Sequence, residues 1–177
     1  TSFAQVYDLF MDNVPYQKWC AHLCRLFHGM GIARGTVVEL GCGTGTLTGL
    51  MADAGYDMIG VDNSLDMLQL AGGREGILFL LQDMRSLALV GSVCAVYSAC
   101  DCMNYILEED GLRQVFARVF DHLTPGGAFV FDMNTPYKYR EVLAENTFAE
   151  NREEGSFIWE NYFDGDRGLN EYDLTLF

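Results

Sequence analysis

The sequence predicts an α/β fold: a central, mostly parallel β-sheet with helices on both faces. Strand-length apolar runs alternate with helical segments through Asp132, which is the pattern of parallel strands joined by right-handed crossovers. The glycine-rich segment Gly41 to Gly45 directly follows the first of these runs, where α/β proteins bind nucleotides. The chain has 177 residues, 50% of them hydrophobic, which is enough for one core covered on two faces.

The elements before the glycine segment are a helix and a strand. Residues 15–28 predict an amphipathic helix, and Pro15 suits its first turn. Val37 to Leu40 is typical of the end of a buried strand. The glycines after it allow a sharp turn and a close approach to a ligand, and the next helix offers unpaired N–H groups at its start. Together these elements predict a nucleotide-type binding corner.

Glu39 indicates the kind of nucleotide. The dinucleotide fingerprint is G-x-G-x-x-G, with a pyrophosphate on the helix N-terminus. Here the pattern is G-x-G-x-G, and Thr46 stands at the place of the third fingerprint glycine. A carboxylate two residues before the first glycine would repel a pyrophosphate but would suit a cationic ligand. S-adenosylmethionine is such a ligand, because it carries a sulfonium, an ammonium and no phosphate.

The next apolar run, Asp57–Asp62, predicts a second strand that ends in an acid. Asp62 follows Gly41 by 21 residues, close to the spacing at which a carboxylate binds the ribose hydroxyls in a Rossmann-like unit. The same side chain could instead cap the helix that starts near Asn63 and Ser64, although Ser64 is itself a good cap. We therefore favour the ribose role.

Three more runs complete the predicted sheet. Ile77–Met84 is typical of a third, buried strand that ends in an acid, and Val93–Ser98 predicts a fourth strand. Residues 109–123 carry a row of apolar side chains at helical spacing and predict the clearest helix of the chain. The fifth strand is expected over Ala128–Asp132.

Five of these motifs, in order, resemble those of the class I S-adenosylmethionine-dependent methyltransferases, over nearly the whole chain to about Tyr139. The run E-x-G-x-G-x-G at Glu39 resembles the first family motif, and Leu123 to Gly127 resembles the L-x-P-G-G that introduces the fifth strand. D-x-x-N-Y at Asp101 and F-D-x-N-T-P at Phe131 are similar to small, soluble bacterial members. The resemblance implies a Rossmann-like fold that uses S-adenosylmethionine for in-line methyl transfer. The acceptor is unidentified: the charge of the chain favours a small molecule, and a tRNA or protein acceptor stays open.

The resemblance also implies which residues bind the cofactor. Asp83 would accept from the adenine amine and Met84 would cover the ring, although a strand-end acid can also cap a turn. Tyr16 and Trp19 would close over the cofactor, although both could equally be core aromatics. The full set is Glu39, Gly41, Cys42, Gly43, Gly45, Asp62, Asn63, Asp83, Met84, Ala99, Tyr16 and Trp19, with Cys42 a small filler of the loop.

The acceptor is expected to face Asp101, Asn104 and Tyr105, which follow the fourth strand where open α/β sheets place ligands. The same residues could merely cap a helix. No catalytic residue is assigned, because the cofactor already carries the activation and a base is required only for a protonated or weakly nucleophilic acceptor. Tyr105 and Asp101 are the candidates for such a base.

Residues 155–177 form a second predicted region after a cofactor-binding domain over residues 1–154. A strand-like run, the turn residues Asp164–Gly168 and a second alternating run predict an antiparallel hairpin. This hairpin could supply the two strands with which the family's sheet closes, but we expect it instead to begin a lid over the ligand end of the sheet and to continue beyond Phe177. The segment from Pro136 to about Glu145 is expected to be a helix.

Composition limits the partners and the compartment. The chain has 11 basic and 25 acidic residues, for a net charge of −14, and the basic residues are scattered, which disfavours nucleic-acid binding and favours a neutral or cationic small molecule. No membrane span or secretion signal is visible, so we expect a cytoplasmic protein. The six cysteines lie mostly in apolar stretches, which disfavours disulfides. Cys20, Cys24 and His28 share a helix face, but no second ligand cluster supports a metal site there.

Two other functions stay open. The chain could bind S-adenosylmethionine without turnover, as a sensor or partner subunit, because its cofactor motifs are more diagnostic than its acceptor pocket. A nicotinamide-dependent oxidoreductase is less favoured, because Glu39 and Thr46 depart from the dinucleotide fingerprint. The sequence determines neither the identity of the acceptor nor the oligomeric state.

Overall fold

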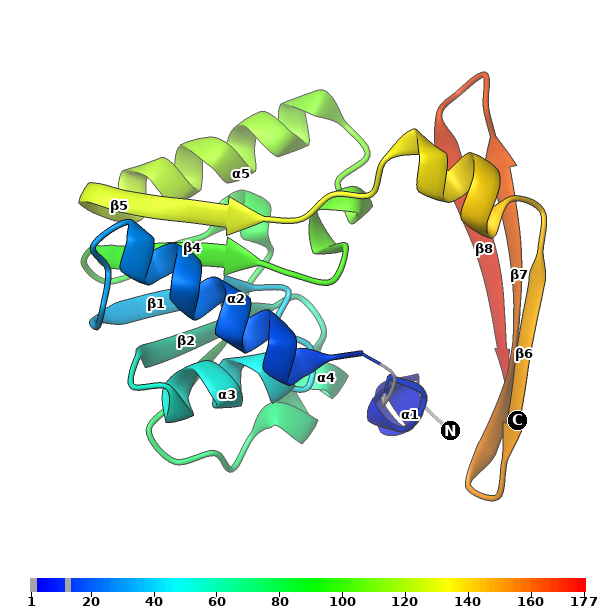
Figure 1. The fold of residues 1–177 in the computed structure, drawn as a ribbon, viewed down its shortest axis with the longest axis horizontal. Helices are drawn as coiled ribbons and strands as arrows, with labels where there is room; N and C mark the ends of the chain where they lie inside the picture. Colours follow the sequence, from blue (N-terminus) through cyan, green and yellow to red (C-terminus); the bar gives the residue numbers. More distant parts are fainter. Residues whose placement is uncertain (1–2, 12–13) are drawn as a thin grey trace. The chain divides into compact units, whose positions relative to one another are not determined.

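The computed structural model describes residues 3–11 and 14–177, which belong to two compact units (Figure 1). One unit, here called the sheet unit, comprises Phe10–Met133; the other, the terminal unit, comprises Thr1–Leu9 and Asn134–Phe177. The domain boundary expected at residue 155 stays a prediction. None of the helices formed by the described residues combines the length and the apolar character that a membrane crossing requires.

The sheet unit contains a five-stranded sheet in the order β3-β2-β1-β4-β5, and every neighbouring pair is parallel. This confirms the predicted fold class. The β4–β5 ladder shifts register between Val93 and Ala95, where Pro125 of β5 has no N–H to donate. The strands are β1 (Thr36–Leu40), β2 (Asp57–Asp62), β3 (Leu78–Leu81), β4 (Val93–Ser98) and β5 (Leu123–Phe131).

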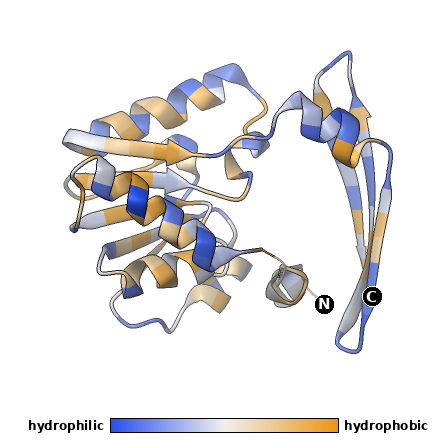
Figure 2. Ribbon diagram, in the orientation of Figure 1, coloured by the Kyte–Doolittle hydropathy of each residue, from blue (hydrophilic) through white to orange (hydrophobic). Residues whose placement is uncertain are grey.

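Helices cover both faces of this sheet. On one face, Phe27 of α2 and Met51 of α3 are fully buried against Tyr97 of β4. On the other face, Val115 and Val119 of α5 form the second core cluster with strand residues. Hydrophobic and hydrophilic residues alternate along α5 (Figure 2), as its sequence predicts. The helices are α2 (Tyr16–Gly29), α3 (Thr46–Asp53), α4 (Leu65–Ala71) and α5 (Glu109–His122), and α1 (Phe3–Phe10) precedes them.

The third strand differs from its prediction. It was expected to be buried over Ile77–Met84, but β3 ends at Leu81, and the side chains of Leu78 and Leu81 are each 54% exposed. The reason is its place at the edge of the sheet, where it pairs with β2 alone. An apolar run of this length does not by itself distinguish an edge strand from a central one. Asp83 therefore lies beyond the strand, in front of the 3₁₀ turn η1 (Met84–Ser86).

The terminal unit contains a separate antiparallel sheet in the order β6-β7-β8. The predicted hairpin is confirmed, and its strands pair with β6 and not with the parallel sheet. The helix predicted from Pro136 is present, but it ends in the π-helical segment η3 (Lys138–Leu143), after which Ala144 has a φ of +47°. The strands are β6 (Thr147–Arg152), β7 (Gly155–Asp164) and β8 (Leu169–Leu176).

Candidate functional site

The candidate site lies at the carboxyl ends of the parallel strands. Strand β1 has β2 on one side and β4 on the other. The chain passes from β1 to β2 and β3 on one side and then returns to β4 on the other side of β1, so the strand order reverses between β1 and β4. A crevice at such a switch point is where open α/β sheets bind ligands. Four segments meet this edge: the glycine loop after β1, Asp62 at the end of β2, the segment from Ala99 to Tyr105 after β4, and Asp132 after β5.

The three glycines of the loop are required for different structural reasons. Gly41, Gly43 and Gly45 all have left-handed backbones, with φ of +73°, +53° and +74°. A Cβ at Gly41 would lie 2.5 Å from the sulfur of Cys102, and one at Gly45 would lie 2.9 Å from the ring of Phe79. A Cβ at Gly43 would meet nothing within 4 Å. Gly41 and Gly45 are therefore required for packing, whereas Gly43 faces open space and is the loop position available to a ligand.

Asp62 joins the glycine loop to the next turn. Its Oδ2 atom accepts a hydrogen bond of 2.8 Å from the backbone N–H of Gly43, and its Oδ1 atom accepts one of 2.9 Å from the N–H of Ser64. The side chain of Ser64, not that of Asp62, caps helix α4 by accepting from Met67 N–H. Each oxygen of Asp62 keeps a further acceptor site. Asn63, between them, is exposed.

Glu39 lies beneath the glycine loop. Its side chain is buried, and its Oε2 atom accepts hydrogen bonds from the hydroxyl of Tyr97, at 2.9 Å, and from the hydroxyl of Thr48. Burial raises the pKa of Glu39 from 4.5 to about 7, against the opposing effect of these two hydrogen bonds. Glu39 thus supports the loop from below, and its charge depends on pH near neutrality.

Asp83 and Met84 lie on η1 after β3. The carboxylate of Asp83 forms an ion pair with the guanidinium of Arg85 and accepts from the backbone N–H of Arg85 at 2.8 Å, so it caps this turn. The hydrogen bonds from the Arg85 side chain lower the pKa of Asp83. The methyl carbon of Met84 lies 3.9 Å from the position of a Cβ at Gly41. The structure therefore brings Met84 to the glycine loop and gives Asp83 the capping role that the sequence left open.

The segment after β4 lies against the same loop. The thiol of Cys102 donates to the carbonyl of Gly41 at 3.4 Å, and the hydroxyl of Ser98 donates to the carbonyl of Leu40 at 3.1 Å. Cys100 and Asp101 have φ of +60° and +70°, a left-handed backbone that costs energy in residues other than glycine and is concentrated at functional sites. The 3₁₀ turn η2 (Cys102–Tyr105) follows, with Ala99 buried, Asn104 half-buried and Tyr105 65% exposed.

Asp132 is the acid that the sequence prediction left out. Its Oδ2 atom accepts from the backbone N–H of Asp101 at 3.1 Å, whereas its Oδ1 atom is buried and has no hydrogen-bond partner. Burial, with the nearby charge of Asp101, raises the pKa of Asp132. The signal was present, because Asp132 ends the fifth apolar run as Asp62 ends the second.

A cavity of about 440 Å³ opens between helix α2 and the ends of β4 and β5. Trp19, one of the residues expected to close over the cofactor, lies in its wall, and Tyr16, one helical turn before it, is half-buried. The other lining residues are Pro15, Lys18, His22, Leu23 and Leu26 from the helix side and Ser98, Ala99, Val130, Phe131 and Asp132 from the strands. Its volume is within the range of small-molecule sites.

The chemistry of these groups fits S-adenosylmethionine. Burial and the neighbouring charges of Glu39 and Asp62 raise the pKa of the buried Cys42 thiol in the glycine loop. Burial and Glu39 do the same for Cys102, to which Asp62 and Asp132 also contribute. The edge of the sheet is thus acidic, which suits the sulfonium and ammonium of S-adenosylmethionine and would oppose a pyrophosphate.

Comparisons with known proteins agree with this chemistry. Residues 37–127 match the family described as methyltransferase domain. YqeM of Bacillus subtilis (strain 168), by its name a candidate methyltransferase, is 33% identical over 99% of this chain and 71% of its own length. A similarly named protein of Geobacillus sp. (strain WCH70) is 34% identical over 99% of this chain and 74% of its own length.

Solved structures share the fold. The crystal structure of an S-adenosylmethionine-dependent methyltransferase from Clostridium acetobutylicum ATCC 824 superposes with a TM-score of 0.81 at 28% identity, over 98% of this chain and 79% of the other. DesVI of Streptomyces venezuelae has a TM-score of 0.80 at 21% identity, over 100% of this chain and 83% of its own. The second likeness shows the fold alone.

Proposed function

Because the chain belongs to the methyltransferase-domain family and is an S-adenosylmethionine-dependent methyltransferase, we propose that it transfers the methyl group to a small-molecule acceptor at the ends of β4 and β5. The observation that carries the proposal is the loop geometry: Gly43 faces open space while its N–H is fixed to the carboxylate of Asp62. A ligand on this loop meets acidic groups and no side chain at Gly43.

We assign the cofactor contacts as follows. Asp62 holds the ribose hydroxyls with the acceptor sites that Gly43 and Ser64 leave open, and Asn63 lies at the rim. Met84 covers the adenine beside Gly41, and Asp83 shares its carboxylate between the adenine amine and Arg85.

The remaining cofactor contacts surround the methionine end. Ala99 and the loop backbone at Gly41 and Cys42 border it, Glu39 supports it from below, and Tyr16 and Trp19 close over it. The opposite charges of the carboxylates and the sulfonium supply part of the affinity.

The chain's own task in catalysis is alignment. The bound cofactor supplies an electrophilic methyl carbon, and the protein orients the acceptor's lone pair toward it and excludes water. Asp101, Asn104 and Tyr105 are assigned to the acceptor side, because they follow β4 in the segment that packs on the glycine loop. The left-handed backbone of Cys100 and Asp101 fixes the direction in which this segment leaves the strand.

A small-molecule acceptor is supported by charge and by fold. A net charge of −14 opposes a polyanionic substrate. KedS8, a sugar N-methyltransferase from Streptoalloteichus sp. ATCC 53650, shares the fold with a TM-score of 0.77 at 17% identity, over 97% of this chain and 76% of its own. We also propose a cytoplasmic location, which the six cysteines support because none of them forms a disulfide in the described structure and thiols persist in a reducing compartment.

Calorimetric titration with S-adenosylmethionine and S-adenosylhomocysteine tests the cofactor site, and Asp62→Asn is compared with Asp66→Asn on the exposed side of α4. We expect micromolar binding, weakened about tenfold or more by Asp62→Asn alone. A radiolabelled methyl-donor assay then compares the low-mass and macromolecular fractions of a cell extract. Transfer to the low-mass fraction supports the proposal; binding with no transfer to any fraction favours the idle sensor, and tight NADH binding in place of S-adenosylhomocysteine would contradict the cofactor assignment.

A further inference from the structure

We propose that the cavity between α2 and the ends of β4 and β5 binds the methyl acceptor as a small zwitterion, with its ammonium on Asp132 and its anionic group toward Lys18 and His22. The proposal rests on the proposed function and specifies the acceptor's chemical class. The cavity, its single carboxylate, which belongs to the half-buried Asp132, and the basic residues on the helix side are independent features of the same space.

The first step concerns Asp132. Its Oδ1 atom is buried in the cavity wall without a hydrogen-bond partner, and a buried acceptor left unsatisfied destabilises the folded protein. Among the described residues, no lysine or arginine forms an ion pair with Asp132, and its charged neighbour is another acid, Asp101. An ammonium group in the cavity supplies a donor and a positive charge to the Asp132 carboxylate.

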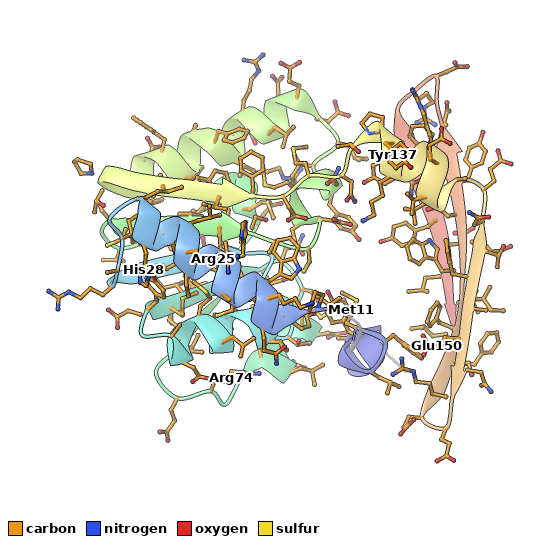
Figure 3. The ribbon with its side chains drawn as sticks, viewed as in Figure 1. Met11, Arg25, His28, Arg74, Tyr137 and Glu150 are labelled. Carbon is orange, nitrogen blue, oxygen red and sulfur yellow. The ribbon has the colours of Figure 1, made fainter. Side chains whose placement is uncertain are left out.

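The second step concerns the helix wall. Lys18 and His22 are one helical turn apart on α2 and line the same cavity. The guanidinium of Arg25, labelled on α2 in Figure 3, lies 3.3 Å from Nδ1 of His22. Because arginine only donates, Nδ1 accepts and Nε2 of His22 carries the proton as a donor. Two donors thus stand opposite an acceptor, and a ligand with one cationic and one anionic end matches both.

The third step concerns the walls between these ends. Trp19, Leu23 and Leu26 from the helix and Val130 from β5 make this part of the cavity apolar. An aliphatic or ring segment between the two charged ends of the ligand would be desolvated there. A free alkylamine would leave Lys18 and His22 unmatched, and a dicarboxylate would face Asp132.

The fourth step connects the cavity to the reaction. Ser98 and Ala99 line the cavity, and the hydroxyl of Ser98 is bonded to the carbonyl of Leu40, the residue before the glycine loop. The acceptor therefore lies next to the segment that holds the cofactor. Asp132 takes a proton from the ammonium: an N–H bond breaks, an O–H bond forms on the carboxylate, and the nitrogen keeps the electron pair. That pair would form the new N–C bond to the methyl carbon as the carbon–sulfur bond of the sulfonium breaks and its electrons stay on sulfur. The carboxyl then releases the proton to solvent.

The test uses the straight-chain ω-amino acids from glycine to 6-aminohexanoate as probes, titrated calorimetrically into protein saturated with S-adenosylhomocysteine. N-acetylated 6-aminohexanoate, which lacks the ammonium, and hexylamine, which lacks the carboxylate, are the matched ligands. We expect an optimum chain length, with both matched ligands at least tenfold weaker. Asp132→Asn should weaken the best probe at least tenfold and leave S-adenosylhomocysteine affinity within twofold, and Lys18→Gln should weaken the amino acids but not hexylamine. Asp121→Asn and Arg118→Gln, both on the exposed side of α5, are the control variants.

A second readout follows the Asp132 carboxyl carbon by NMR, whose titration should move to lower pH when the probe binds. If no probe binds while S-adenosylhomocysteine does, the inference is wrong and the proposed function stands. If Asp132→Asn weakens S-adenosylhomocysteine as strongly as the probe, the carboxylate serves the cofactor's own ammonium and the inference is likewise wrong. Absence of S-adenosylhomocysteine binding would contradict the proposed function itself.

Discussion

The phenolic hydroxyl of Tyr97 donates a hydrogen bond of 2.9 Å to Oε2 of Glu39, in the buried layer directly beneath the glycine loop. This contact joins β4 to β1, the two neighbouring strands between which the strand order reverses. Thr48 of α3 donates to the same oxygen, so one carboxylate ties both strands to the helix that follows the loop. The rigidity of the loop therefore depends on an ionisable group.

This arrangement predicts a pH-dependent stability that Glu39→Gln removes. Burial raises the pKa of Glu39 from 4.5 to about 7. Between pH 4.5 and pH 7, Glu39 is therefore protonated in the folded protein and ionised in the unfolded chain. The stabilising contribution is complete below pH 4.5 and is lost as the pH rises through 7, with a span of about 3 kcal/mol. Urea unfolding at pH 5, 6, 7 and 8 should show the wild type losing stability relative to Glu39→Gln. Parallel pH profiles for the two proteins would contradict the buried, raised-pKa state.

A set of glycine substitutions separates backbone strain from ligand binding. Gly43→Ala places a Cβ in open space at a φ of +53°, so we expect a loss of about 1–2 kcal/mol of stability from the backbone alone. Gly31→Ala, at a φ of +81° with nothing within 4 Å, is the matched control away from the loop. The two variants should unfold at similar urea concentrations, but only Gly43→Ala should weaken S-adenosylhomocysteine binding, by tenfold or more. Equal affinities in both variants would show that Gly43 does not face the cofactor.

Gly41→Ala should behave differently from both. A Cβ there would lie 2.5 Å from the sulfur and 2.9 Å from the Cβ of Cys102, in addition to the cost of a φ of +73°. We expect it to destabilise the fold by more than Gly43→Ala, because the η2 turn must move away from the loop. Cys102→Ala in the Gly41→Ala background removes the clashing sulfur and should restore part of the loss. An unchanged loss in the double variant would mean that the backbone conformation, not the contact with Cys102, is responsible.

The sequence predicts most of the sheet unit because local signals and the fold agree there. Two local signals predict their elements without reference to the rest of the fold: the helical spacing of Trp19, Leu23 and Phe27, and the β-branched pair before Glu39. The structure confirms both elements. Strand β6 was missed, since Thr147–Arg152 has one large apolar side chain. The two-residue turn that joins it to β7 consists of Glu153 and Glu154, which are not typical hairpin-turn residues.

The site residues are harder to predict than the strands. That Asp83 pairs with Arg85, or that Glu39 accepts from Tyr97, depends on which way a side chain turns at the end of a strand. Residue spacing gives the edge of the sheet on which an acid lies, but not its partner. For Asp132, the sequence gives the position at the end of the fifth strand, but it does not predict that one carboxylate oxygen is buried without a hydrogen-bond partner.

Asp83 and Arg85 give a prediction in which binding and stability separate. Their ion pair lies at the surface, with side chains 32% and 51% exposed, so Arg85→Gln should leave the free energy of unfolding close to that of the wild type. If Asp83 accepts from the adenine amine, Asp83→Asn should weaken S-adenosylhomocysteine about tenfold, whereas Arg85→Gln should preserve or strengthen it because it frees the carboxylate. Calorimetric titration of the two variants, together with S-inosylhomocysteine, which lacks the amine, measures this. An equal loss in both variants would assign the pair to turn stability alone.

The thiols of the loop region give a chemical test of the acidic environment. Burial and the charges of Glu39 and Asp62 raise the pKa of Cys42, and burial and Glu39 raise that of Cys102. Only the thiolate is nucleophilic, so both residues should react with iodoacetamide at pH 8 far more slowly in the folded protein than in 6 M guanidinium. Peptide mass spectrometry after timed labelling gives each rate, and Cys94, half-buried on β4 at the other end of the sheet from the loop, is the internal comparison. Glu39→Gln removes one of these charges and should accelerate the labelling of Cys42. Rapid labelling of Cys42 in the wild type would contradict the prediction, because it would mean that the loop is open to solvent and less acidic than its burial and neighbouring carboxylates imply.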